Sequence, residues 1–339
     1  MIWKIPPEMC QWDITSKCNL RCRHCRATAS WKKEGDIPFN EVISILDQLI
    51  SLAPDVVLAI AGGEPLARED LREILEWLKK RNSSTAVALL SNATLISEAN
   101  IGWLSETVGE FNISLEGASA EVNDFVRGAG SFSKALKGIS LLVKHGLPTT
   151  VRMTFFQQEE REVESLMRFL PEIGIKSFNF RYVVPVGRAQ GHAVSSIQHE
   201  RLCKTIWQLG KELGIEVGFS DPFPEILVNE NLQKEMKMDK ELMSGKAVTG
   251  CSIAFNLLYI DPQGIVRACP YFPIVCDDAK SKPLAEIWSE NETLQMMRKV
   301  RGIIGGKCGE CEYKFACGGC RGSALATGDF LGEDPRCWK

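Results

Sequence analysis

This sequence has no apolar run of the roughly 20 residues that a membrane-spanning helix needs. Its N-terminus, M-I-W-K-I-P-P-E, has no signal-peptide core, so we expect a cytoplasmic protein with no membrane partner. An excess of one charge is also lacking, because 40 basic and 43 acidic residues give a net charge of −3. This balance argues against nucleic acid as a partner. No low-complexity tract is present, and 45% hydrophobic residues are typical of a globular protein.

Cysteine, in contrast, is abundant. The 339 residues include 13 cysteines, and most of them fall into closely spaced groups. A small secreted protein would use such cysteines as disulfides, but this chain is long and has no secretion signal. In a reducing cytosol, clustered cysteines indicate metal ligands instead.

The first group consists of Cys18, Cys22 and Cys25, spaced C-x3-C-x2-C in the segment K-C-N-L-R-C-R-H-C-R. Three thiolates this close together can all reach one metal centre. A cubic four-iron cluster normally takes four protein ligands, and no fourth cysteine lies beside these three. One iron would therefore be free to bind another molecule. This makes the three cysteines the candidate catalytic centre.

Apolar strand-like runs alternate six times with helix-like segments, in which apolar residues recur at three- and four-residue steps. The predicted strands are Trp12–Thr15, Val56–Ala61, Thr85–Leu90, Phe111–Leu115, Thr149–Phe155 and Lys176–Val184. The predicted helices are Phe39–Leu52, Glu69–Arg81, Glu98–Glu106, Ser131–His145, Glu159–Leu170 and one near His199–Leu213. Strict alternation predicts an α/β protein with a parallel sheet and right-handed crossovers. Six units fit a partial (β/α)6 TIM-like barrel, with its site at the C-terminal ends of the strands.

Four short segments are expected at this edge of the sheet, together with the cysteine loop. They are Gly62-Gly63-Glu64-Pro65, Ser91-Asn92-Ala93-Thr94, Ser114-Leu115-Glu116-Gly117 and Pro185-Val186-Gly187-Arg188. Two adjacent glycines let the backbone approach a ligand closely, and the Glu64 carboxylate can balance an ammonium group. Taken alone, each segment is also an ordinary strand-to-helix turn. Their shared position at one edge is what makes them candidate ligand contacts.

A second field of cysteines begins at Cys251, after a charged stretch over residues 229–246 that predicts a helix or a connector. Two short apolar strands around D-P-Q-G, Leu257–Ile260 and Ile265–Val266, predict a hairpin that would bring Cys251 and Cys269 together. Further on, C-x2-C-x5-C-x2-C has the paired spacing of a structural zinc site. Thiolates bind iron–sulfur clusters as well as zinc, so ligand type alone leaves both open.

In order and spacing, the cysteine loop and the four segments resemble the radical S-adenosylmethionine (SAM) enzymes. The resemblance implies that SAM binds the free iron of a [4Fe–4S] cluster and is cleaved to a 5′-deoxyadenosyl radical. It implies SAM contacts from Gly62, Gly63, Glu64, Pro65, Ser91, Asn92, Ser114, Glu116 and Arg188. Two positions depart from the family pattern, because Ala93 replaces the glycine of T-N-G-T and Glu116 replaces the aspartate of S-x-D-G.

The later cysteines resemble the SPASM extension of radical SAM enzymes, which typically holds two auxiliary [4Fe–4S] clusters and would bring the total to three. The resemblance divides the chain into a core over residues 1–220, a connector over 221–250 and a small SPASM domain over 251–339. One auxiliary cluster would use Cys251, Cys269 and Cys320, with Cys276 as the candidate fourth ligand. The other would use Cys308, Cys311, Cys317 and Cys337. The x2 spacing before Cys320 departs from the usual x3.

The resemblance implies an enzyme, a radical SAM oxidoreductase or maturase. Our preferred interpretation is the oxidative modification of a ribosomally made peptide or protein, with a flavodoxin- or ferredoxin-type reductant. Seventeen residues precede Cys18, so we expect a peptide to be presented by a separate recognition protein. An alternative is a tetrapyrrole substrate, as in haem or haem d1 biosynthesis. A second alternative is a non-catalytic iron–sulfur or zinc protein, which would form no 5′-deoxyadenosine from SAM.

Overall fold

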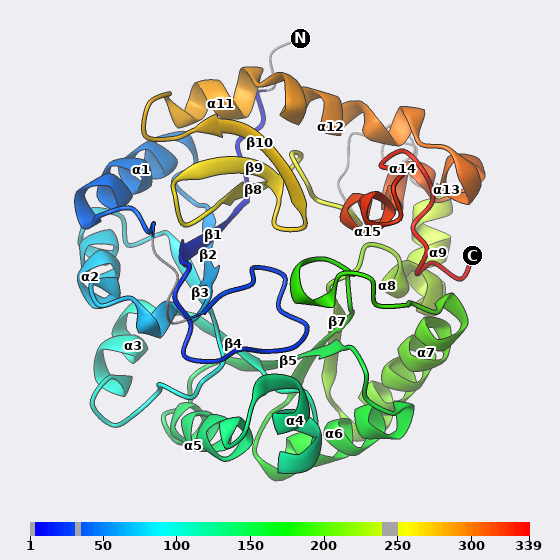
Figure 1. The fold of residues 1–339 in the computed structure, drawn as a ribbon, viewed down its shortest axis with the longest axis horizontal. Helices are drawn as coiled ribbons and strands as arrows, with labels where there is room; N and C mark the ends of the chain where they lie inside the picture. The colour runs from blue at the N-terminus through cyan, green and yellow to red at the C-terminus, as the bar shows by residue number, and fades with distance from the viewer. Residues whose placement is uncertain (1–3, 31–34, 239–249) are drawn as a thin grey trace.

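The structure, a computed structural model, describes residues 4–30, 35–238 and 250–339. Its strands form one sheet in the order β10-β9-β8-β1-β2-β3-β4-β5-β6-β7. Strands β1 to β7 pair in parallel and in chain order, and helices surround them in a ring (Figure 1). Their bounds are β1 Met9–Thr15, β2 Val57–Gly62, β3 Ala86–Ser91, β4 Glu110–Ser114, β5 Thr149–Phe155, β6 Ser177–Tyr182 and β7 Glu216–Phe219.

The outer helices each bury an apolar stripe against the strands. In α1, for example, Val42, Ile45 and Leu49 are buried, at the spacing that places residues on one helix face. The helices of the barrel are α1 Phe39–Leu52, α2 Leu71–Arg81, α3 Ile101–Thr107, α4 Ala120–Arg127, α5 Ser131–Lys144, α6 Glu160–Glu172, α7 Ser196–Leu213 and α8 Pro224–Val228. Two 3-10 turns, η1 Pro65–Ala67 and η2 Gly187–Ala189, lie at the C-terminal edge.

The inner face of the barrel is polar between β4 and β7. Successive side chains of a strand point to opposite faces, so Val151, Met153 and Phe155 of β5 are buried in the apolar core while Arg152 and Thr154 line a cavity. An ordinary closed barrel fills its centre with branched apolar side chains. This barrel instead keeps a polar space at its centre.

The C-terminal segment extends the sheet of the barrel. Strand β8 Leu257–Ile260 lies parallel to β1, and β9 Ile265–Cys269 and β10 Phe272–Asp278 continue the sheet in antiparallel pairs. The predicted hairpin is thus confirmed. Five helices follow, namely α11 Leu284–Glu290, α12 Glu292–Ile303, α13 Gly306–Glu310, α14 Lys314–Cys317 and α15 Arg321–Ala326.

The predicted partial barrel is confirmed, with additions that the sequence did not indicate. Strand β7 is only four residues long, and α4 has eight residues in a segment without an expected element. Helix α9 Glu230–Met238 lies in the stretch expected to be a helix or connector, whose remainder falls outside the described residues. The domain boundaries at 220 and 250 stay a prediction. In the described part of the chain, no helix is both long and apolar enough to span a bilayer.

Candidate active site

The cysteine loop leaves the C-terminal end of β1 and crosses the open centre of the ring as the dark-blue segment in Figure 1. Cys18 and Cys22 are buried and Cys25 is half-buried. The pKa of Cys18 is raised to about 12, mainly by burial and also by the nearby charges of Glu64, Cys22 and Cys25. The structure therefore brings the three predicted cluster ligands together.

Arg188 holds the cysteine loop from the opposite side of the ring. Its Nε donates to the Cys22 carbonyl oxygen at 2.7 Å, and its Nη1 donates to the Ala29 carbonyl oxygen at 3.0 Å. The preceding Gly187 has a φ of +62°, and an added Cβ would lie 2.4 Å from the Arg26 carbonyl oxygen. Glycine is therefore required for η2 to approach the loop this closely.

The Gly62-Gly63 segment packs directly on the backbone of the cysteine loop. Gly63 N donates to the Thr15 carbonyl oxygen at 2.7 Å. A Cβ added to Gly63 would lie 2.0 Å from the Lys17 carbonyl oxygen and 3.0 Å from the Cys18 Cβ. The two glycines thus allow their segment to pack closely against the cysteine loop. Both glycines also line the central cavity.

Glu64 is fully buried and orders the next segment. Its carboxylate accepts hydrogen bonds from Ser91 Oγ at 2.7 Å and from Asn92 N at 2.8 Å. Ala93 then has a φ of +59°, a conformation that favours the glycine of the family pattern. Neither Glu64 nor Pro65 lines the cavity, whereas Ser91 and Asn92 do. The SAM contacts predicted for Glu64 and Pro65 stay predictions.

Glu116 forms a buried ion-pair cluster beneath the loop. Its Oε1 accepts from Arg127 Nη2 at 2.5 Å and lies 2.9 Å from His24 Nε2. Burial alone would raise the pKa of Glu116, but the Arg127 guanidinium and His24 overcome this effect and lower it. Arg127 Nη1 also lies 3.9 Å from Cys22 Sγ. The predicted site residue Glu116 therefore fixes an arginine beside a cluster cysteine.

The central cavity fits the cofactors that the sequence indicates. Its lining includes the thiols of Cys18, Cys22 and Cys25, and also Gly62, Gly63, Ser91, Asn92, Ser114 and Arg188. Arg127, which also lines it, has a buried Nε with no hydrogen-bond partner. The three cysteines would hold the cluster, which together with SAM would supply one-electron chemistry at this position.

Seven of the remaining cysteines separate into the two groups expected from the sequence. Burial is the largest cause of the raised pKa of Cys269, and the neighbouring Cys320 and Cys251 also raise it. The second group, by contrast, shares one cavity, which is lined by Cys308, Cys311, Cys317 and Cys337. In the described residues, no group of three or more Cys, His, Asp or Glu side chains has a geometry that could hold one metal ion. Assigning these groups to auxiliary clusters stays a prediction.

Cys276 lies apart from both groups in its electrostatic surroundings. Burial raises its pKa to about 12, and the charges that act on it are those of Arg267 and Asp277, not of another cysteine. In the β9–β10 pairing Phe272 lies opposite Cys269 and Val275 lies opposite Arg267, so Cys276 lies further along the strand from Cys269, and its role as the candidate fourth ligand stays a prediction.

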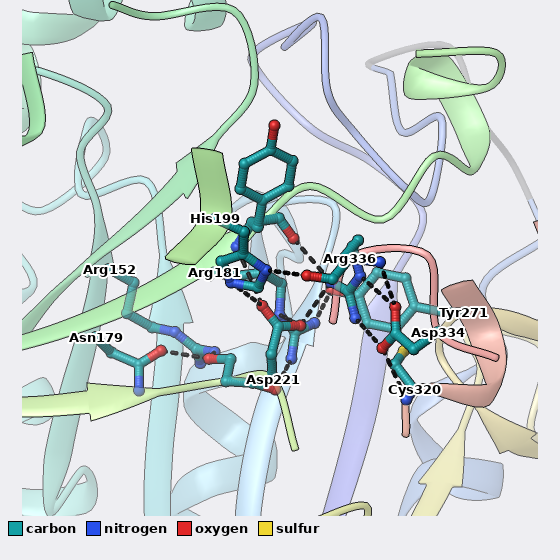
Figure 2. Close-up of polar contacts among 11 residues, drawn as sticks. Arg152, Asn179, Arg181, His199, Asp221, Tyr271, Cys320, Asp334 and Arg336 are labelled. Carbon is teal, nitrogen blue, oxygen red and sulfur yellow. Dashed lines mark hydrogen bonds and ion pairs between the residues drawn. The ribbon is translucent and has the colours of Figure 1, made fainter. Parts of the chain in front are cut away.

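A buried polar network joins the barrel to the C-terminal segment (Figure 2). Arg336, which is fully buried, lies between two carboxylates, with Nη1 2.6 Å from Asp221 Oδ1 and Nη2 3.1 Å from Asp334 Oδ2. Asp334 in turn accepts from the backbone nitrogen of Cys320 at 2.9 Å. On the barrel side, Arg181 Nε lies 4.0 Å from Asp221. The network thus connects a predicted cluster cysteine with the polar interior.

Sequence reasoning missed several residues around the cavity. Arg26 forms two hydrogen bonds with Asp13, at 2.9 and 2.8 Å, and Arg152, Arg181 and Tyr271 line the adjoining inner space. One signal was present for Arg152 and Arg181: apolar and polar residues alternate in T-V-R-M-T-F and F-N-F-R-Y, which places both arginines on the face of the strand opposite the apolar core. A charge at an inward position of a strand indicates a functional cavity.

Comparisons with known proteins agree with this geometry. Residues 12–170 match the radical SAM superfamily, and residues 251–312 match an iron–sulfur cluster-binding domain, SPASM. The AdoMet-dependent heme synthase of Methanosarcina barkeri is 30% identical over 98% of this chain and 96% of its own. The pre-heme d1 synthase of Dinoroseobacter shibae is 28% identical over 98% of this chain and 86% of its own.

A maturase and a solved structure with a bound peptide are similar as well. The mycofactocin maturase MftC of Mycobacterium ulcerans is 26% identical over 98% of this chain and 88% of its own. The crystal structure of Streptococcus suis SuiB bound to precursor peptide SuiA superimposes with a TM-score of 0.80 at 18% identity, covering 100% of this chain and 77% of that one. At this identity the likeness shows the fold alone.

The chain belongs to the radical SAM superfamily and carries a SPASM iron–sulfur cluster-binding segment. It is therefore an enzyme that uses SAM and iron–sulfur chemistry.

Proposed function

We propose that this enzyme oxidises propionate side chains of a tetrapyrrole on the path to haem. The observation that carries the proposal is the heme synthase relative, which is 30% identical over nearly the full length of both chains. The tetrapyrrole substrate, which we held as the alternative from the sequence, therefore becomes the main interpretation.

The charge of the cavity supports a substrate with several carboxylates. Arg26 and Arg181 line the cavity that contains the three cysteines, and Arg152 lines the adjoining inner space. Guanidinium groups bind carboxylates with paired, charge-assisted hydrogen bonds. A tetrapyrrole with propionate groups at its rim presents carboxylates around an apolar ring. Tyr271, whose ring also lines both spaces, offers an aromatic face to such a ring.

The proposed reaction converts a propionate group into a vinyl group. Each conversion releases CO2 and removes one hydrogen atom and one electron from the substrate. SAM with its cluster would supply the hydrogen-atom acceptor, and an auxiliary iron–sulfur cluster would be the class of group that takes up the electron. The protein's own residues bind the carboxylates, orient the side chain and keep water out. Three [4Fe–4S] clusters, a cytoplasmic location and a flavodoxin- or ferredoxin-type electron donor are parts of this proposal.

Peptide modification, our preferred interpretation from the sequence, is the second candidate. The relative that favours it is the mycofactocin maturase, which is 26% identical over 98% of this chain. A peptide would need the separate recognition protein that the sequence led us to expect, and that partner stays a prediction.

The test is an anaerobic incubation of the reconstituted enzyme with SAM, a strong reductant and iron coproporphyrin III. We expect 5′-deoxyadenosine together with tetrapyrrole products that have each lost CO2 and two hydrogens per vinyl group formed, as measured by mass spectrometry. Cys22→Ala should form neither, because it removes one of the three thiolates of the loop. Formation of 5′-deoxyadenosine with the tetrapyrrole unchanged would refute the proposed substrate.

A further inference from the structure

Arg152 stands out among the arginines around the active-site cavity. It lies in the middle of β5, and its half-buried side chain lines the inner space of the barrel. Its Nη2 donates to Ser220 Oγ at 2.8 Å. In the described part of the chain, no carboxylate lies within ion-pair distance of Arg152, so its charge has no acidic partner there.

Three neighbouring arginines have carboxylates, and a fourth, Arg188, donates to two backbone carbonyl oxygens of the cysteine loop. Arg26 pairs with Asp13 at 2.8 Å, Arg127 pairs with Glu116 at 2.5 Å, and Arg181 lies 4.0 Å from Asp221. An arginine whose role is only structural should have its guanidinium charge balanced or hydrogen-bonded by oxygen atoms of the protein. Arg336, for example, donates to two carboxylates and to the Tyr182 carbonyl oxygen.

The electrostatic surroundings of Arg152 favour an anion in the cavity. Burial and then the positive charge of Arg181 lower the pKa of Arg152 to about 10, against smaller raising effects of Tyr271 and of the more distant Glu110. Two guanidinium groups that repel each other would both be stabilised by a carboxylate placed between them. Arg181 is itself held in place, since it donates to the Ser220 carbonyl oxygen at 2.6 Å and to the Tyr271 hydroxyl.

The position of Arg152 connects it to the reaction site. Its cavity has polar walls formed by Asn112, Ser114, Thr154, Asn179, Arg181, Ser220 and Tyr271. Ser114, Thr154, Arg181 and Tyr271 also line the cavity that contains the three cysteines. Figure 2 shows Arg152 and Asn179 on the barrel side of the network, with Tyr271 on the side of the C-terminal segment. A molecule held at Arg152 can therefore extend from the barrel interior to the cysteine loop.

We propose that Arg152 binds one substrate carboxylate inside the barrel, with Tyr271 and Arg181 closing the subsite, and so orients another edge of the substrate toward the cysteine loop. This inference rests on the proposed function, because it takes that carboxylate to be a propionate group of the tetrapyrrole that does not react. Arg152 is thus a specificity-determining residue for a polycarboxylate substrate.

The experiment measures binding to the anaerobically reconstituted enzyme by absorbance titration. The two probes are iron coproporphyrin III and its tetramethyl ester, which has the same ring without the charges. The variants are Arg152→Gln, which removes the cation, and Arg152→Lys, which keeps it. Arg168→Gln is the matched control, because Arg168 is an exposed arginine of α6 that pairs with Glu164 and Glu212.

We expect Arg152→Gln to weaken binding of the free acid by about 10- to 100-fold, the range for losing a hydrogen bond to a charged group. Arg152→Lys should recover part of this loss, and Arg168→Gln should bind like the wild type. The ester should bind the wild type and Arg152→Gln equally, whereas a misfolded variant would lose both probes.

Two results would overturn these ideas separately. If Arg152→Gln binds the free acid as tightly as the wild type does, the subsite is wrong while the proposed function stands. If the wild type binds neither probe, the tetrapyrrole substrate is wrong, and the subsite fails with it.

Discussion

The contact between Gly63 and the cysteine loop gives a sharp test of how the site is built. Replacing Gly63 with alanine would place a Cβ 2.0 Å from the Lys17 carbonyl oxygen, where real Cβ contacts are not closer than 3.0 Å. The two backbones must therefore separate by about 1 Å, since this neighbour is not a flexible side chain. Such overpacking costs about 1–3 kcal/mol of stability. A displacement of about 1 Å at a reacting centre can lower its rate about 10²-fold.

We expect Gly63→Ala to lower the rate of 5′-deoxyadenosine formation by about 10²-fold, with a lower Tm. Gly102→Ala is the matched control, because Gly102 lies in the exposed part of α3 and nothing lies within 4 Å of an added Cβ. Its stability should rise by about 1 kcal/mol, since alanine favours a helix, and SAM cleavage should stay unchanged. If Gly63→Ala forms 5′-deoxyadenosine at the wild-type rate and has the wild-type Tm, the reasoning is refuted.

Three further predictions concern the C-terminal segment and its contacts. Arg336→Met should lower the free energy of unfolding by about 3–5 kcal/mol in denaturant titrations, because it leaves Asp221 and Asp334 buried without their cation. Burial lowers the pKa of His199 from 6.5 to about 4. Between these two pH values the unfolded chain binds a proton at His199 and the folded protein does not, so stability falls as the pH falls below 6.5. From pH 7.5 to 5.5 the wild type should therefore lose about 1.3 kcal/mol of stability that His199→Gln keeps, as denaturant midpoints would show. Cys276→Ser should retain its full iron content after reconstitution, whereas Cys269→Ser should lose up to about four irons. Iron loss in Cys276→Ser would show that Cys276 is a cluster ligand.

Much of the fold was predictable because local periodicity is tied to burial. The predicted strand Val56–Ala61 and the observed β2 Val57–Gly62 differ by one residue at each end, and α1 begins and ends where its apolar pattern does. Parallel strands that alternate with helices place all their C-terminal ends at one edge. The meeting of the cysteine loop and the glycine-rich segment could therefore be expected from the sequence alone.

The side-chain partners within that edge could not be predicted in the same way. Glu64 reaches the backbone of Asn92, and His24 reaches Glu116, through contacts between residues far apart in the sequence. Such pairs depend on strand register and loop path, which local patterns do not determine. Arg127 was missed for a related reason, because α4 is a short helix of which only the last residue lines the cavity.

The C-terminal segment shapes the substrate cavity as well as carrying cysteines. Tyr271 lies between β9 and β10, yet it contacts Arg181 of β6 and lines the spaces next to Arg152 and the cysteine loop. Asp334 accepts a hydrogen bond from the Cys320 backbone nitrogen. Arg336 joins Asp334 to Asp221, which lies beside the same Arg181. A change in the cysteine group around Cys320 would therefore reach the substrate cavity through fixed hydrogen bonds. Because the cysteine loop is held separately by Arg188 and the Gly62-Gly63 segment, such a change should alter substrate binding more than SAM cleavage.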